Sequence, residues 1–195
     1  MWSGWVNRPG RSRGRELVGW IILTLGVGAL QLPALGRMAA RGVDIVQFEL
    51  MRTSDEAVRL SVMLSVDGLA AARQQLYIDY AFLILYGIVL VSACALLAAR
   101  AARRGHPAIA AAAGAFAVLA VVAAACDAAE NIALLAVTFG HTDQPWPGTA
   151  SAFAATKFLL LAVTLLFLAV GFVASLTDRS AQAPAEGDDG GGSAR

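Results

Sequence analysis

Four long apolar stretches constrain the fold of this chain more than any other feature. They cover about residues 17–35, 77–99, 108–139 and 150–176. A helix needs about 20 predominantly apolar residues to cross a bilayer, and each stretch is close to that length or longer. The sequence therefore predicts an all-α, polytopic membrane protein, built as a bundle of four transmembrane helices.

The composition excludes a soluble globule. Hydrophobic residues make up 58% of the chain and charged residues 15%, whereas ordinary soluble domains have about 45–50% and about 25%. The net charge of +1 offers no basic face for a nucleic-acid partner. Membrane lipids are the expected partners, and the sequence leaves open whether the chain forms a homo-oligomer.

The polar segments define the organisation around the spans. We expect a cytoplasmic basic tail at 1–16, a membrane domain at 17–180 with an outer helical insert at about 36–76, and a C-terminal tail at 181–195. That last segment is rich in Ala, Gly, Asp and Ser and has no apolar periodicity, so it is predicted to be disordered.

The insert carries helix-start signals. Thr53 followed by Glu56 matches a capping box and predicts a helix that begins there. A second start at Ser65 or Asp67 is expected to continue into the second span. Short amphipathic pieces of this kind are predicted to lie as a cap on the outer surface of the bundle.

Arginines flank the spans unevenly, and positive residues in short segments favour the cytoplasmic side. They precede the first span and fill the loop after the second: Arg8, Arg11, Arg13, Arg15, Arg100, Arg103 and Arg104. We therefore expect a multi-pass protein of the cell membrane with both termini cytoplasmic. The first span is interpreted as an uncleaved anchor, with a cleaved signal peptide as the alternative.

Four ionisable residues interrupt the spans: Asp79, Asp127, Glu130 and Lys157. Each costs about 2.5–3.5 kcal/mol on insertion scales, so such residues normally face a partner or a cavity. In the predicted topology all four reach a similar depth on the outer side. Left fully ionised, they would carry a charge of about −2, so at least one carboxyl is expected to be protonated or a cation to be bound.

Helical spacing supports one polar cluster. Asp127, Glu130 and Asn131 follow i, i+3, i+4 spacing and share a face of the third span, and Asp79 shares a face of the second span with Tyr86. Lys157 is the only lysine of the chain. The predicted ligand-binding or structural cluster is Asp79, Tyr80, Tyr86, Asp127, Glu130, Asn131 and Lys157.

The sequence predicts neither a metal site nor a cofactor. Cys94 and Cys126 are expected at depths about 20 Å apart, too far for a disulfide. His106 and His141 fall in different loops, and a metal site needs at least three converging ligands. Phosphate-loop, dinucleotide, nucleophile-elbow and zinc-protease motifs are absent from the sequence, so no catalytic residue is predicted.

Several short motifs carry a resemblance: Phe48-Glu49-Leu50, Ile78 to Phe82 with Tyr86, and Asp127 to Asn131. The pattern resembles small, uncharacterised four-helix bacterial inner-membrane proteins with an outer helical insert between the first two spans. The resemblance implies this architecture, and it implies that Asp79, Tyr80, Asp127, Glu130 and Asn131 belong together. It implies no activity.

Three functions fit the predicted cluster. The favoured one is a protein that binds a lipid or other small amphiphile in an outward-facing polar pocket. The alternatives are a membrane-embedded enzyme using Asp127 or Glu130 as general acid or base, and a subunit of a proton- or cation-coupled transporter. The structural alternative is that the polar groups only connect the helices through ion pairs and hydrogen bonds and bind no ligand.

Overall fold

The computed structural model describes residues 10–180, with side chains from Arg13 to Ala174. The described part is all-helical, as predicted, with short loops between the helices: α2 (Gly10–Ala39), α3 (Ile45–Glu49), α4 (Ser54–Arg103), α5 (Pro107–Thr138) and α6 (Trp146–Ser180). Within the described residues, all of these except α3 are long and apolar enough to cross a membrane. The prediction of four long apolar helices is confirmed.

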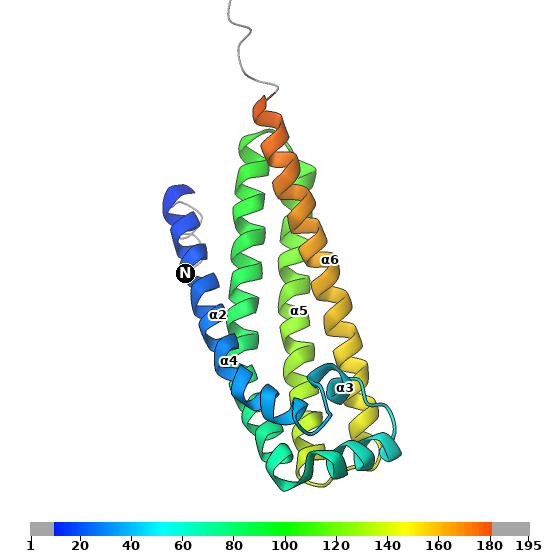
Figure 1. The fold of residues 1–195 in the computed structure, drawn as a ribbon. Helices are drawn as coiled ribbons and strands as arrows, with labels where there is room; N and C mark the ends of the chain where they lie inside the picture. Colours follow the sequence, from blue (N-terminus) through cyan, green and yellow to red (C-terminus); the bar gives the residue numbers. More distant parts are fainter. Residues whose placement is uncertain (1–9, 181–195) are drawn as a thin grey trace, which may run out of the picture.

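The long helices pack side by side in chain order. α4 packs on α5, α5 packs on α6, and α2 packs along α4. Figure 1 shows α2 and α6 on opposite sides of the pair formed by α4 and α5, with α3 at the end of the bundle where α2 finishes. We call this end, where α3 lies, the α3 end.

Two apolar cores divide the bundle along its length. The core at the α3 end includes Phe48, Leu76 and Leu134, and the second core includes Leu90 and Leu168. In the second core the rings of Phe116 from α5 and Phe167 from α6 stack with their centroids 4.0 Å apart. The stretches of α4 and α5 between these cores hold the polar residues, so a polar layer separates two apolar ones.

The start of α4 follows the predicted capping box. The Thr53 hydroxyl oxygen accepts a hydrogen bond from the Glu56 amide at 3.2 Å, and the Glu56 carboxylate accepts one from the Thr53 amide at 3.2 Å. These bonds satisfy two of the amide groups that a helix start leaves without partners.

A kink at Ser65 divides α4. Ser65 has φ 57° and ψ −175°, in the left-handed region that a residue with a side chain rarely adopts. Arg41, in the turn after α2, donates to the Ser65 hydroxyl and lies 3.3 Å from the carboxylate of Asp67. This contact holds the turn after α2 against the bend in α4.

The insert expected over about residues 36–76 is matched only in part. α2 continues to Ala39, α3 is a helix of five residues, and the remainder belongs to α4. The helix expected from Thr53 ends at Ser65, whose dihedral angles are non-helical, and a second helical stretch continues from this kink into the second long apolar segment. The second start expected at Ser65 or Asp67 therefore coincides with the kink. The insert is made of α3 and the part of α4 before the kink, and the stretch from the kink to Leu76 belongs to the long helix.

Only part of the predicted N-terminal tail, and none of the C-terminal one, falls within the described residues. The segment interpreted as a basic tail at 1–16 is helical from Gly10 onward, and the residues before it, like the tail at 181–195, lie outside the described residues. Cys94 and Cys126 are both buried and free. The prediction that they form no disulfide is confirmed.

Candidate functional site

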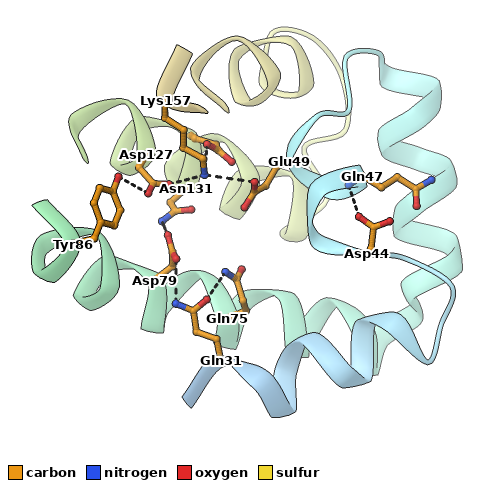
Figure 2. Close-up of polar contacts among 11 residues, drawn as sticks. Gln31, Asp44, Gln47, Glu49, Gln75, Asp79, Tyr86, Asp127, Asn131 and Lys157 are labelled. Carbon is orange, nitrogen blue, oxygen red and sulfur yellow. Dashed lines mark hydrogen bonds and ion pairs between the residues drawn. The ribbon is translucent and has the colours of Figure 1, made fainter. Parts of the chain in front are cut away.

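Lys157 lies at the centre of a buried ionic cluster in the polar layer. Its Nζ is 2.8 Å from Asp127 Oδ1, 2.8 Å from Glu130 Oε2 and 3.6 Å from Glu49 Oε2. The lysine is only 5% exposed. Three carboxylates from α3 and α5 thus surround one ammonium from α6 (Figure 2).

A chain of amides continues the cluster toward α2. Asp79 accepts hydrogen bonds from Asn131 Nδ2 at 2.8 Å and from Gln31 Nε2 at 3.2 Å. Gln31 Oε1 in turn accepts from Gln75 Nε2 at 3.2 Å. Figure 2 shows this chain running from α5 through α4 to α2. Uncharged donors therefore hold Asp79, which pairs with no cation in the described part of the chain.

The structure brings most of the predicted residues together. Tyr86 joins them through its hydroxyl, which donates to Asp127 Oδ2 at 2.9 Å. Tyr80 lies apart, because its hydroxyl donates to the main-chain oxygen of Ala128 at 3.4 Å. The brought-together set is Asp79, Tyr86, Asp127, Glu130, Asn131 and Lys157.

Three members of the cluster were not predicted: Gln31, Glu49 and Gln75. The glutamines are uncharged, so a search for ionisable residues passes over them, although Gln31 interrupts an otherwise apolar stretch. Glu49 belongs to an insert whose acidic and basic residues nearly balance. The feature that could have indicated Glu49 is its position directly after Phe48, a large apolar residue that is fully buried in α3.

A cavity of about 400 Å³ adjoins the cluster. Polar groups line its deep end, including Asp79, Asp127 and Lys157, while leucines and aromatic rings line the rest. Phe158 and Leu165 border it from α6 and are 40% and 55% exposed. The cavity therefore opens through the side of the bundle, between α6 and the part of α2 that lines it at Gln31 and Leu35.

The cavity is suited to binding more clearly than to catalysis. None of its described lining residues is a serine, cysteine or histidine, and both oxygens of Asp127 already accept hydrogen bonds. No group of metal-ligating side chains suitable for an ion occurs among the described residues. The geometry offers fixed charges and acceptors beside an apolar channel.

A larger hollow of about 630 Å³ lies between α4 and α5 in the second core. Its walls are mainly alanine and valine, with Arg13 as the one charged residue lining it in the described part of the chain. No converging polar groups line this hollow in the described part of the chain. The smaller cavity is the better candidate site, because it combines an apolar wall with converging polar groups.

Glu49 is the ionisable member of the cluster that lies outside the long helices. Burial raises the pKa of its carboxyl from the ordinary value of 4.5 to about 7, against the opposing effect of Lys157. Glu49 therefore changes charge near neutral pH, at the point where α3 closes the end of the cavity.

The pH dependence of stability should report this group. A carboxyl whose pKa is raised by folding binds a proton in the folded state before the unfolded state does. Its contribution is therefore present in acid and is lost as pH rises from about 4.5 through about 7. We expect Glu49→Gln to remove a fall in stability of up to about 3 kcal/mol across this range.

Thermal unfolding of the purified protein between pH 5 and pH 8 would measure this effect. Asp67→Asn is the matched control, because Asp67 is an exposed carboxylate at the same end of the molecule. Parallel pH profiles for wild type and Glu49→Gln would contradict the assignment.

Comparison of the chain with protein-family models finds no match, and searches among curated proteins and among solved structures find none either.

Proposed function

We propose that this chain is an integral membrane protein that binds a lipid or another small amphiphile in the side-opening cavity. The observation that carries the proposal is the composition of the cavity wall along its length. Charged and amide groups converge at one end, and apolar side chains of α6 reach the side of the bundle at the other. An amphiphile has the same division, with a polar head and an apolar tail.

The ionic cluster supports binding by its rigidity. Lys157 contacts residues of α3 and α5, and Asp79 contacts residues of α2 and α5. These contacts fix five helices around the deep end of the cavity before any ligand enters. A pre-formed site loses less conformational freedom on binding than a flexible one.

A photoreactive fatty alcohol in lipid nanodiscs tests the proposal. We expect its label to map to α6 and α2 at the cavity, and Leu161→Trp to abolish most of that labelling because the larger side chain fills the channel. The matched control is Leu159→Trp, on the same helix but 64% exposed and not part of the cavity wall. Equal labelling of both variants at the cavity residues would contradict the proposal.

The proposal includes an orientation in the cell membrane, with both termini on the cytoplasmic side and the α3 end outside. The excess of arginine around the start of α2 and around the end of α4 supports it. We expect Asp67→Cys to react with a membrane-impermeant maleimide in intact cells. His106→Cys, in the loop between α4 and α5, should react only after the cells are opened, and the reverse pattern would overturn the orientation.

A further inference from the structure

The wall of the cavity holds a buried acceptor without a donor. Gln75 is 3% exposed and lines the cavity, and its Oε1 has no hydrogen-bond partner among the described residues. A buried acceptor without a donor costs about 1–3 kcal/mol. A ligand that brings donors would recover this energy.

The ammonium and hydroxyl donors of the cluster are already engaged, and each side-chain amide uses one N–H group. The Lys157 ammonium faces three carboxylates, and the amides of Gln31 and Asn131 both donate to Asp79. The Tyr86 hydroxyl donates to Asp127. Each side-chain amide has a second N–H group, so hydrogen bonding alone does not exclude a ligand acceptor, and the charge of the site decides between the two kinds of head group.

The charge balance selects the same kind of ligand. Four carboxyl groups converge on the site, Glu49 from α3, Asp79 from α4, and Asp127 and Glu130 from α5, and they face a single ammonium on Lys157. An anionic head would add to an excess of negative charge in a site removed from water. A cationic head would reduce it.

We propose that the ligand is an amphiphile with a protonated primary amine as its head. The proposal rests on the binding function proposed above and names the ligand class. The ammonium donates to Gln75 Oε1 and to the Glu49 carboxylate, which both line the cavity. The tail lies along the α6 wall at Phe158, Leu161 and Leu165 and leaves through the side of the bundle.

Glu49 is the carboxylate best placed to exchange partners. Its 3.6 Å distance to Lys157 is the longest of the three ion pairs, and the other two carboxylates keep the lysine paired. Because burial raises the pKa of Glu49 to about 7, cation binding should displace a proton from it. Affinity should therefore rise with pH from 6 to 8, while an alkylamine, like lysine with its pKa of about 10.4, stays protonated.

Binding of radiolabelled dodecylamine to the full chain in phosphatidylcholine nanodiscs tests the proposal, because that lipid has no N–H donor. Dodecyltrimethylammonium has the same chain length and charge without donors, dodecanol has a donor without charge, and ethylamine lacks the tail. We expect dodecylamine to bind at least about tenfold more tightly than each of the others, which is about 1.4 kcal/mol.

The variants locate the head of the ligand. Glu49→Gln and Gln75→Leu should each weaken dodecylamine binding about tenfold and leave dodecanol binding unchanged. Glu49→Gln should also remove the rise in affinity with pH. Asp67→Asn, an exposed carboxylate remote from the cavity wall, should leave both unchanged. If Gln75→Leu fails to fold, Glu49→Gln and its pH profile still decide the question.

The possible failures are distinguishable. If dodecanol and the quaternary amine bind as tightly as dodecylamine, and Leu161→Trp blocks all three, the amine class is wrong and the binding function stands. If ethylamine binds as tightly as dodecylamine, the ligand is a small amine and the amphiphile assignment is wrong. If wild type binds none of the probes, both proposals are wrong.

Discussion

Lys157→Met should destabilise the protein by about 3–5 kcal/mol, the usual cost of removing one partner from a buried ionic group. The substitution keeps most of the side-chain volume but leaves the carboxylates of Asp127, Glu130 and Glu49 without their ammonium. Lys157→Ala should cost more, because it also leaves a cavity. Unfolding of the purified protein in detergent would measure both.

A double-mutant cycle shows whether the loss comes from the ionic cluster. Asp127→Asn combined with Lys157→Met should recover part of the stability, because it removes one of the unpaired charges. Arg59→Met is the control, since Arg59 is exposed at the same end of the bundle, where charge interactions contribute about 0–1 kcal/mol. Additive effects of the two buried substitutions would contradict the coupling.

Phe48→Ala should cost about 3–5 kcal/mol, as other truncations of buried aromatic rings do. Phe48 is fully buried and is the largest anchor of α3 in the core at its end of the bundle. Val46 of the same short helix is 49% exposed, so Val46→Ala provides the matched control and should have little effect.

The loss of the Phe48 ring should also release Glu49 from its buried position beside Lys157. A five-residue helix is too short to be stable alone, so α3 keeps its place through its buried ring. In Phe48→Ala the pH dependence assigned to Glu49 should therefore weaken along with the stability. Retention of the full pH dependence at a lowered melting temperature would show that another contact positions the carboxylate.

The four-helix architecture could be predicted because long apolar stretches have few alternatives in a bilayer. The details at the α3 end could not. The sequence predicts a second helix start at Ser65 or Asp67, but the positive φ of Ser65, which sets the direction of the bend, follows from no local sequence pattern. The contact from Arg41 that holds this bend joins residues far apart in the sequence.

The structure brings predicted residues together where helical geometry decides. The i, i+3, i+4 spacing brings Asp127, Glu130 and Asn131 to one face, and antiparallel helices bring Lys157 to their depth. Tyr80 follows Asp79 directly, so it points about 100° away from it around α4. Spacing alone could have separated the two. The resemblance had placed them together.

The remaining members could not be found from charge and spacing. Gln31 and Gln75 became visible only once Asp79 and its hydrogen bonds were placed. Glu49 reaches Lys157 because α3 folds back over the end of the bundle. Such loop-dependent contacts follow from packing between distant segments, which a single sequence does not encode in any local pattern.

The position of Lys157 on the last membrane helix has a consequence for synthesis. The ribosome completes Glu49, Asp127 and Glu130 before it makes the lysine with which all three pair. Until α6 packs against the other helices, the nascent chain holds these three carboxyl groups without their ammonium. Final assembly is thus deferred to the moment α6 arrives, and a chain truncated after α5 should be retained at the insertion machinery or degraded.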